Sequence, residues 1–457
     1  MKGTYTIVTF GCQMNKSDSE TMAGILEEKG YAPVDTPEQS DVILLNTCAV
    51  RGHSEEKAYS YLGHYRSLKE QNPDRIIGFT GCVAQKEGRD LLDRFSHLDF
   101  VMGPQNLTGL GNYIDTIREE NRRLLATDGE LEMVQSDTPR TRKDGEQAWV
   151  PIMTGCDKFC TFCIVPHTRG RERSRDPEDI TREVESLVED GYREITLLGQ
   201  TVNSYGKTLP DGQNFPNLLK KIDSIPGDYR IRFTSPHPMD TPPELVNCYR
   251  DLDHLAAHIH LPVQSGSNRI LRRMNRKYTR EEYLEIIDNI ESLDRDIAIT
   301  TDVIVGFPGE TEEDFQQTLD LFEEVRYDGA YVFKYSPRSG TPAAKMEDQL
   351  DEDVIEERHQ ILLDRHEEIA REDNQKYVGT IQEVYVEGHS PKSTEDDPQF
   401  TGRMSTNDVV VFDAIGEEWI GEFIPVQINE AGSYTFFGEA DVSRRSSEKT
   451  VTEAAAV

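Results

Sequence analysis

Three closely spaced cysteines, Cys156, Cys160 and Cys163, are the residues of this chain best suited to chemistry. They stand in the pattern C-x-x-x-C-x-x-C, just after an apolar, strand-like run that begins at Trp149. Three thiolates on one short loop hold three irons of an iron–sulfur cluster, and the fourth iron then stays open to a small molecule. The alternatives are a group of buried thiols or a zinc knuckle, which needs four ligands and has only His167 nearby. The pattern favours the cluster.

Three further cysteines stand at equivalent places in an N-terminal α/β unit. Each follows a predicted strand: Cys12 after 4–10, Cys48 after 41–46 and Cys82 after 75–80. Open α/β sheets bind ligands outside the carboxyl ends of their strands, so we expect these thiols to converge at one edge. Gly11 and Gly81 allow the backbone to turn tightly beside a bulky ligand. A cysteine at a strand end is also a common small hydrophobe, but three in equivalent positions favour a second cluster.

The sequence around both sets of cysteines resembles the radical S-adenosylmethionine methylthiotransferases. The resemblance is carried by Phe162 before the last cysteine and by four segments: Gly11-Cys-Gln-Met-Asn15, Thr80-Gly-Cys-Val-Ala-Gln85, Gly103-Pro-Gln-Asn106 and residues 155–170. It implies two [4Fe-4S] clusters and S-adenosylmethionine as cofactors. In the family, the cluster on the C-x-x-x-C-x-x-C cysteines, here Cys156, Cys160 and Cys163, binds S-adenosylmethionine and, when reduced, cleaves it to a 5′-deoxyadenosyl radical. The resemblance assigns Cys12, Cys48 and Cys82 to the auxiliary cluster, which carries the sulfur to be inserted.

The resemblance also implies a reaction and a substrate. It implies methylthiolation at C2 of an adenosine next to the tRNA anticodon, with two molecules of S-adenosylmethionine used per turnover. The motifs look most like the bacterial branch that acts on N6-isopentenyladenosine at position 37. The alternatives are N6-threonylcarbamoyladenosine in tRNA and an aspartate of a ribosomal protein. An alternative of another class is a non-catalytic iron–sulfur sensor that binds RNA.

The elements that must position these residues form three units. We expect residues 1–140 to form a doubly wound α/β domain, because the three strands named above and a short fourth strand at 100–103 alternate with helices over 17–29 and 53–71. Residues 146–375 contain six strand candidates, most followed by helical sequence, which predicts a partial (β/α)6 barrel. The strand candidates are 149–154, 194–198, 230–234, 258–261, 299–304 and 329–334, and helices between them include 179–190, 280–293 and 312–325. Residues 105–145 are expected to form a helix and a linker.

Polar and glycine-rich residues recur at the carboxyl ends of these barrel strands, where such barrels carry their chemistry. By resemblance, they line the cofactor pocket: Gly199 and Gln200 beside the amino group of S-adenosylmethionine, Val305 and Gly306 beside its adenine, with Phe162, Gln264 and Ser265 nearby. Each of them alone is more simply a turn residue or a solvated side chain. For Asp157 and Lys158 in the cysteine loop, a plain solvated position is an equally good interpretation. Cys248 lies outside both sets, and we expect it to be a buried thiol.

Residues 377–443 contain short β-rich runs separated by turns, which predict a small β-barrel. This barrel resembles the RNA-binding TRAM module of the family, with Arg403 and Asn407 as RNA-binding candidates. An exposed arginine is otherwise most often just solvated. We expect 390–398 to be a loop and 444–457 to be a disordered tail.

Composition restricts the class of protein. The chain of 457 residues has no apolar run of membrane-spanning length, and its start has no signal-peptide pattern. Seven grouped cysteines indicate a reducing, cytoplasmic environment rather than a disulfide scaffold. The net charge of −34, spread along the chain, indicates a cell with a salt-rich interior, where screening lets an acidic protein bind RNA. We expect a monomer that takes electrons from a flavodoxin or ferredoxin.

Overall fold

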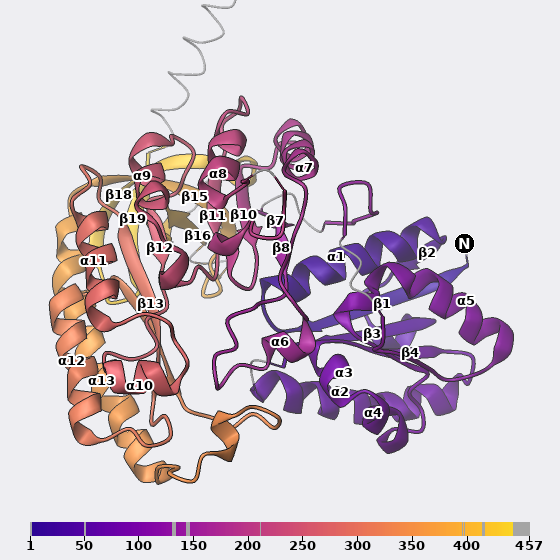
Figure 1. Ribbon diagram of the computed structural model, residues 1–457. Helices are drawn as coiled ribbons and strands as arrows, with labels where there is room; N and C mark the ends of the chain where they lie inside the picture. The colour runs from indigo at the N-terminus through magenta and orange to yellow at the C-terminus, as the bar shows by residue number, and fades with distance from the viewer. Residues whose placement is uncertain are drawn as a thin grey trace, which may run out of the picture.

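The computed structural model describes residues 2–49, 52–129, 134–142, 147–210, 212–394, 396, 398–413 and 416–441. Its strands form a six-stranded sheet, a partial barrel and a small closed barrel, in that order along the chain (Figure 1). The expected tail at 444–457 lies outside the described residues. No helix in the described ranges is both long enough and apolar enough to cross a membrane.

The first sheet is parallel throughout, with the strand order β2-β1-β3-β4-β5-β6. The strands are β1 (Gly3–Phe10), β2 (Tyr31–Pro33), β3 (Val42–Thr47), β4 (Ile76–Gly81), β5 (Phe100–Met102) and β6 (Leu124–Ala126). Every residue of β3 and β4 is buried, because helices cover both faces of the sheet. The helices are α1 (Gln13–Glu28), α2 (Gly52–Gln71), α3 (Cys82–Glu87), α4 (Arg89–Arg94) and α5 (Leu110–Glu120), with short turns η1 (Pro37–Gln39) and η2 (Pro104–Gly109).

Helices α1 and α5 pack on one face of this sheet, and α2, α3 and α4 pack on the other. The doubly wound fold expected from the sequence is therefore present. Two strands were not expected. Both β2 and β6 are only three residues long, and β6 lies inside the stretch that we expected to be helix and linker.

The second unit contains six parallel strands. They are β7 (Gln147–Pro151), β10 (Glu194–Leu198), β11 (Arg230–Phe233), β12 (His258–His260), β13 (Ala298–Val305) and β14 (Gly329–Lys334). Strands β7, β10 and β11 form one half-sheet and β12, β13 and β14 the other, and a parallel bridge between Ile231 and Leu255 joins them. This is the expected partial (β/α)6 barrel, with β7 and β14 at its two edges. A short antiparallel pair, β8 (Met153–Thr154) and β9 (Arg173–Ser174), lies beside it.

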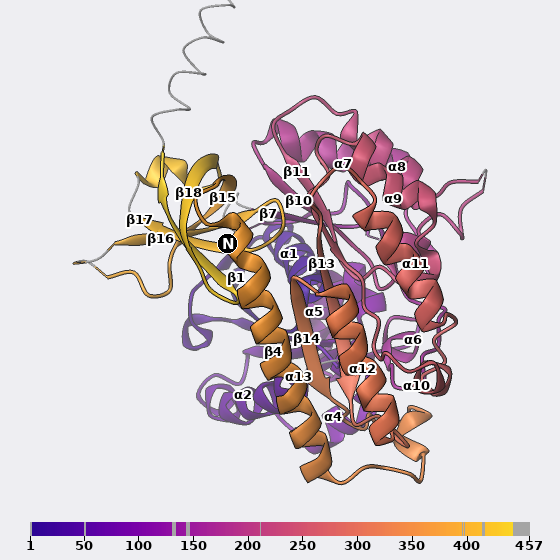
Figure 2. The ribbon, with the colours of Figure 1, turned by 90° about the vertical axis from the view of Figure 1, so that its left-hand side faces the viewer.

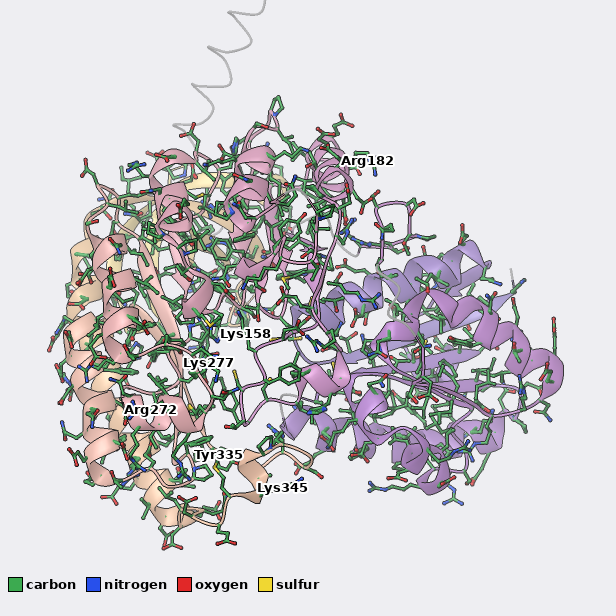
Figure 3. The ribbon with its side chains drawn as sticks, in the orientation of Figure 1. Lys158, Arg182, Arg272, Lys277, Tyr335 and Lys345 are labelled. Atoms are coloured by element: carbon green, nitrogen blue, oxygen red, sulfur yellow. The ribbon has the colours of Figure 1, made fainter. Side chains whose placement is uncertain are left out.

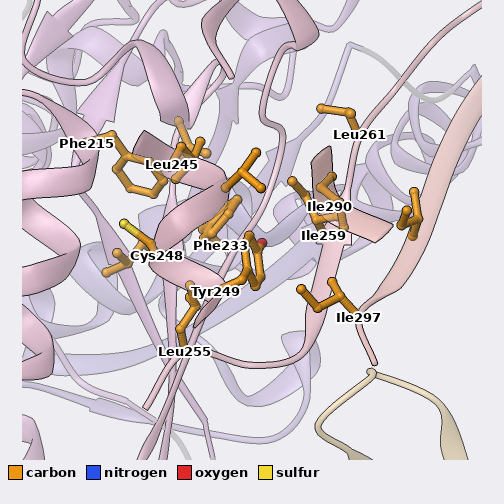
Figure 4. Close-up of a cluster of buried hydrophobic side chains, with 14 of the residues drawn as sticks. Phe215, Phe233, Leu245, Cys248, Tyr249, Leu255, Ile259, Leu261, Ile290 and Ile297 are labelled. Atoms are coloured by element: carbon orange, nitrogen blue, oxygen red, sulfur yellow. The ribbon is translucent and has the colours of Figure 1, made fainter. Parts of the chain in front are cut away.

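The helices of this unit cover the outside of the barrel, except α6 (Val165–Thr168), which packs against α3 of the first unit. The others are α7 (Pro177–Glu189), α8 (Phe215–Asp223), α9 (Pro243–Asp251), α10 (Asn268–Arg273), α11 (Arg280–Glu291), α12 (Glu312–Val325) and α13 (Glu352–Asp373), with η3 (Val202–Ser204), η4 (Pro238–Asp240), η5 (Ala343–Lys345) and η6 (Asn374–Tyr377). Local sequence fixes their starts: in α12, the side chains of Thr311 and Asp314 form a capping box. Their apolar stripes and the outward residues of the strands form one large core, part of which Figure 4 shows. Cys248 lies fully buried in this core, as expected.

The last unit is a closed five-stranded barrel with the order β15-β16-β17-β19-β18. Its elements are β15 (Ile381–His389), β16 (Gln399–Met404), β17 (Val409–Asp413), η7 (Glu417–Trp419), β18 (Phe423–Ala431) and β19 (Thr435–Ala440). It lies at the carboxyl end of the long helix α13 (Figure 2). The small barrel was expected, but strand β16 was not identified from the sequence.

Candidate functional site

The first three cysteines lie together at the carboxyl edge of the first sheet. Cys12 follows β1, Cys48 follows β3, and Cys82 begins α3 directly after β4. These strands are neighbours in the sheet, and the strand order reverses direction between β1 and β3. In doubly wound sheets, a crevice for ligands forms at this reversal. The structure therefore brings the three thiols to the place where the fold binds ligands.

A buried pair of asparagines fixes two of these cysteines relative to each other. The Asn15 amide donates to Asn46 Oδ1 (3.1 Å), and the Asn46 amide donates to the Asn15 carbonyl (2.8 Å). Asn15 Oδ1 also accepts from the Cys12 backbone N–H at 3.4 Å. Helix α1 consequently begins at Gln13 with Cys12 as its N-cap, four residues before the expected start at Ser17. No sequence motif indicated the contact between Asn15 and Asn46, which joins residues 31 positions apart.

Charge also gathers at this edge. The hydrogen bond with the Cys48 thiol, helped by the charge of Arg169, lowers the pKa of Cys12 to about 6 against the opposing effect of burial. Arg169 is buried, which opposes its charge, but Asp18 and the thiols of Cys82 and Cys12 together raise its pKa. Its Nη2 lies 2.6 Å from Asp18 Oδ2 on α1. A buried cation beside the thiols of Cys12 and Cys82 favours their thiolate forms, which are the forms that bind metal.

The second set of cysteines lies on the loop after β8. Cys156 Sγ lies 3.2 Å from Thr201 Oγ1, beyond the end of β10. Cys160 Sγ accepts a hydrogen bond from the buried Arg276 guanidinium at 3.6 Å. Burial raises the pKa of the Cys163 thiol to about 12, and the neighbouring thiols of Cys160 and Cys156 add to that rise. The three thiols therefore interact with one another, and cluster binding requires their protons to leave.

Hydrogen bonds from distant segments hold this loop. The Thr161 N–H donates to the Met274 carbonyl (3.0 Å), and the Thr161 carbonyl accepts from Ala343 (2.9 Å). Phe159 has a left-handed φ of 49°, and its carbonyl accepts from the Asn275 amide at 2.9 Å. Such backbone strain in a non-glycine residue persists only where surrounding contacts impose it, often at functional sites. The loop is thus a constrained structure rather than a free surface turn.

Asp157 is exposed, as a solvated position would be, but the solvated interpretation is wrong for Lys158. Lys158 pairs with Asp240, and both side chains are 10% exposed or less. Asp157 pairs with the more exposed Arg171 at 2.6 Å. Asp240 lies 82 positions after Lys158, so the pattern around the cysteines did not indicate this partner. Figure 3 shows Lys158, a residue of the cysteine loop, on the side of the barrel that faces the first unit.

The residues expected to line a cofactor pocket lie at the carboxyl ends of the barrel strands, around this loop. Gly199 and Gln200 follow β10, and Val305 and Gly306 close β13. The side-chain oxygen of Gln200 is buried and accepts no hydrogen bond from any described residue. An unpartnered buried acceptor is costly unless a ligand supplies a donor. It therefore fits the ammonium group of an amino-acid-like cofactor.

The other pocket candidates lie close by. Gln264 and Ser265 are buried after β12, and Gln264 has a left-handed φ of 71°. Phe162 contacts Phe307, with ring centroids 6.4 Å apart, and Phe307 follows Gly306. Ser235, after β11, is also left-handed at φ 60°. Strained residues at successive strand ends are a signal of a functional site that the sequence alone did not reveal.

The two sets of cysteines are linked by a short segment. Residues 164–169 run from Cys163 to Arg169, and the helix α6 within them packs against α3, which begins at Cys82. Ile164 belongs to the same core cluster as Cys82. Arg169 then extends to Cys12 and Cys82. The fold therefore places the two candidate sites next to each other, and not on separate surfaces.

Arg403 and Asn407 lie in the small barrel, near the amino end of the large one. Arg403 Nε donates to Glu387 at 2.9 Å and its Nη1 donates to the Asn407 carbonyl at 2.9 Å. The turn between them is held from the large barrel by the buried Arg232, which donates to the carbonyls of Met404 (2.7 Å) and Ser405 (3.0 Å). Both RNA-binding candidates thus belong to a turn that joins the two barrels, and their contact with RNA stays a prediction.

Within the described residues, no three His, Cys, Asp or Glu side chains are placed to hold a single metal ion, and this holds for both cysteine sets. His167, the only candidate for a fourth zinc ligand in the sequence, is exposed on α6. Each candidate site offers three thiols as ligands, and residues 164–169 link the two sites. Thiolates are the ligands that iron–sulfur clusters require.

Comparisons with known proteins agree with this arrangement. Residues 150–322 match the Radical SAM superfamily, residues 4–103 match the Uncharacterized protein family UPF0004, and residues 375–441 match the TRAM domain. A "tRNA-2-methylthio-N(6)-dimethylallyladenosine synthase" of Carboxydothermus hydrogenoformans is 46% identical over 93% of this chain and 97% of its own length. The protein of the same name from Acetivibrio thermocellus is 46% identical over 96% of this chain and 91% of its own.

A solved structure is also similar in fold. The radical S-adenosylmethionine methyltransferase TsrM from Kitasatospora setae, solved with cobalamin and a [4Fe-4S] cluster bound, matches with a TM-score of 0.56 at 14% identity, covering 75% of this chain and 77% of that one. At this identity the match supports the fold alone. The near full-length relatives establish more: the chain belongs to the radical S-adenosylmethionine methylthiotransferases, in the family of the tRNA-2-methylthio-N(6)-dimethylallyladenosine synthases.

Proposed function

We propose that the protein replaces the C2 hydrogen of N6-dimethylallyladenosine at position 37 of tRNA with a methylthio group. The observation that carries the proposal is the pairing of two three-cysteine sites through one short segment, in a chain 46% identical over nearly its full length to enzymes with that name. An aromatic C–H bond resists acid–base substitution, so the reaction needs a radical and a sulfur source in the same cavity. Two neighbouring three-cysteine sites would provide the radical and the sulfur source side by side.

The cofactors have distinct residues to hold them. Cys156, Cys160 and Cys163 would hold one [4Fe-4S] cluster and leave one iron for S-adenosylmethionine. Cys12, Cys48 and Cys82 would hold the auxiliary cluster. When bound, the cluster on Cys156, Cys160 and Cys163 together with S-adenosylmethionine supplies the 5′-deoxyadenosyl radical, and the auxiliary cluster supplies the sulfur.

Residues of the barrel would line the cofactor pocket and hold the cysteine loop in place. The side-chain oxygen of Gln200, next to Gly199, is buried without a partner and would accept from the ammonium of S-adenosylmethionine. Phe162, Gln264, Ser265, Val305 and Gly306 form the rest of the cofactor pocket. Arg276 donates to Cys160 and also to the Pro262 carbonyl at 2.8 Å, so it ties the cysteine loop to the end of β12. This positioning role predicts that Arg276 affects cluster stability rather than proton transfer.

Unpaired cations beside the site suit an RNA substrate. Among the described residues, Arg272, Lys277 and Lys345 have no carboxylate partner, although the net charge of the chain is −34. The helix of Arg272 and the turn of Lys345 are neighbours, because the next residue on that helix, Arg273, lies 2.7 Å from Asp348. Figure 3 shows all three cations on the side of the barrel that borders the cysteine loop. Phosphate contacts from such cations bind RNA without reading its sequence.

These cations give a direct test of RNA binding. Changing Arg272, Lys277 and Lys345 to glutamine lowers the affinity for a tRNA anticodon stem–loop and reduces the slope of log affinity against log salt by about two, since each lost single-strand phosphate contact removes about 0.7. Exposed Lys220, on helix α8 outside the large barrel, is the matched control. An unchanged salt slope in the triple variant contradicts the assignment.

The proposal also covers the position of the substrate base, the electron donor and the oligomeric state. The substrate base is in the anticodon loop, because only an unpaired, splayed base gives access to C2. A flavodoxin or ferredoxin supplies electrons, and the enzyme acts as a monomer in the cytoplasm, where tRNA is present and thiols remain reduced. Arg403 and Asn407 are retained as RNA contacts of the small barrel.

Two triple variants test the proposed function with purified, reconstituted enzyme. Replacing Cys156, Cys160 and Cys163 with alanine abolishes cleavage of S-adenosylmethionine but keeps iron at the first site. Replacing Cys12, Cys48 and Cys82 stops methylthiolation of the RNA while cleavage continues. Full methylthiolation by either variant refutes the two-site assignment, and wild-type enzyme that never cleaves S-adenosylmethionine points to the sensor alternative.

A further inference from the structure

Strand β14 carries two exposed aromatic side chains on one face. Tyr331 is 59% exposed and Phe333 is 50% exposed. Residues two apart on a strand point to the same side. Val332 between them is buried in the core that contains residues of α13, so Tyr331 and Phe333 point to the opposite side, into the open interior of the partial barrel. Adjacent exposed aromatic rings inside a concave fold indicate a binding surface rather than random exposure.

The neighbouring strands complete this surface with one carboxylate and one apolar group. The parallel register places Asp302 opposite Tyr331 and Ile304 opposite Phe333. His260 Nε2 lies 3.4 Å from Asp302 Oδ1, and its ring meets that of Tyr331 edge-on at 5.9 Å. We call Tyr331, Phe333, Ile304, Asp302 and His260 the β14 face.

The β14 face is continuous with the cysteine loop. Strand β14 ends at Lys334, and the next residue, Tyr335, packs edge-on against Phe307 with ring centroids 5.4 Å apart. Phe307 in turn contacts Phe162 of the cysteine loop. Tyr335, Phe307 and Phe162 belong to one small core cluster. A ligand on the β14 face therefore lies on the strand whose end supports the radical-forming site.

We propose that the β14 face binds the target adenine and selects an apolar substituent on its N6. The proposal rests on the function proposed above. Base recognition in RNA loops relies on stacking against aromatic side chains, and Tyr331 offers such a ring. The dimethylallyl group then contacts Phe333 and Ile304, while Asp302 accepts from the single hydrogen on N6.

The same carboxylate rejects the alternative substrate. An N6-threonylcarbamoyl group carries a carboxylate of its own, so it brings a second negative charge towards Asp302. Like charges at close range disfavour binding, and specificity often depends on such repulsion as much as on attraction. An aromatic surface also leaves the polar substituent without hydrogen-bond partners. The β14 face thus distinguishes the two tRNA nucleosides through charge and apolarity.

Kinetics of the reconstituted holoenzyme on two synthetic anticodon stem–loops test this. One carries N6-dimethylallyladenosine and the other N6-threonylcarbamoyladenosine at the target position. Tyr331→Ala raises the KM for the dimethylallyl RNA by roughly 5- to 150-fold, the range expected for loss of one base–aromatic stack. Phe333→Ala removes an apolar contact with the dimethylallyl group and raises this KM by roughly tenfold or more. Asp302→Asn raises the relative kcat/KM for the threonylcarbamoyl RNA by about tenfold or more. Ile361→Ala, 42% exposed on α13, is the matched control and leaves both rates unchanged.

The outcomes are distinguishable. Iron content and the thermal midpoint establish that each variant is folded. If wild-type enzyme converts the dimethylallyl RNA and Y331A and F333A keep the wild-type KM, the proposal that the β14 face binds the target adenine is refuted. Wild-type enzyme that converts neither RNA refutes the proposed function instead. In that case, fluorescence anisotropy of the labelled dimethylallyl RNA still decides the inference, since Y331A and F333A bind it more weakly if the face is the site and equally if it is not.

Discussion

Glu20 on α1 provides a quantitative test of how the first unit is attached to the barrel. Its side chain is only 15% exposed and lies 3.6 Å from Arg142 of the connecting segment. Arg142 and Arg140 both pair with Glu183 on α7. Burial raises the pKa of Glu20 to about 7, and Glu183 adds to the rise, while Arg142 and Arg140 oppose it. The folded protein therefore favours the neutral form of Glu20.

The size of the effect follows from the two pKa values. The difference between about 7 in the folded protein and the ordinary 4.5 corresponds to about 3 kcal/mol. Below pH 4.5, both folded and unfolded chains hold the proton, and Glu20 has no cost. As pH rises from 4.5 to 7, the unfolded chain loses the proton first, so stability falls. Above pH 7 the full cost remains.

Glu20→Gln removes this titration. We expect the variant to match wild type near pH 4.5 and to be more stable by up to about 3 kcal/mol at pH 8. Urea unfolding under anaerobic conditions, followed by the fluorescence of Trp149 in β7, measures the difference across this range. Comparing the two proteins at each pH cancels the other titrating groups. Glu28→Gln, exposed on the same helix, is the control. An E20Q variant that is no more stable than wild type at pH 8 refutes the reasoning.

Three further predictions follow from the fold. Gly155 has φ 78°, and a Cβ added there would lie 2.0 Å from the Arg171 carbonyl oxygen. We therefore expect Gly155→Ala to lose the iron bound by Cys156, which iron content measures, and normal iron loading contradicts this. Arg232→Ala leaves Glu194, whose side chain is 2% exposed, without its closest cation. We expect the variant to lose roughly 3–5 kcal/mol of stability in urea unfolding. A loss below about 1 kcal/mol contradicts the role of Arg232 in joining the two barrels. Raising KCl from about 0.1 M to about 1 M increases the thermal midpoint of unfolding, because a screening length of about 3 Å suppresses repulsion among the carboxylates. A midpoint that stays constant or falls contradicts the hypothesis of a salt-rich cell interior.

The sequence was sufficient to predict the architecture because local patterns specified it. Apolar runs such as 42–47 and 76–81 are buried along their whole length, and helix α12 begins at Glu312 and ends at Val325, as expected. Strands β2 and β6 were missed because three residues give no periodicity to recognise. Strand β16 was missed because it directly follows a polar, acidic loop.

The candidate sites were predictable to the level of the cysteines and no further. Convergence of Cys12, Cys48 and Cys82 follows from strand order, which alternation of strands and helices indicates. The partners that fix the sites, such as Asn46 for Asn15 and Arg276 for Cys160, come from contacts across 31 and 116 positions. No local pattern encodes such pairs, because they depend on how the elements pack.

The most direct test of the central claim is mass spectrometry of nucleosides from total tRNA, with and without this gene. The account predicts that deletion removes 2-methylthio-N6-isopentenyladenosine and that its unthiolated precursor accumulates. Loss of a methylthiolated threonylcarbamoyl nucleoside, with the isopentenyl product unchanged, contradicts the substrate while retaining the chemistry. No change in either nucleoside contradicts the account itself.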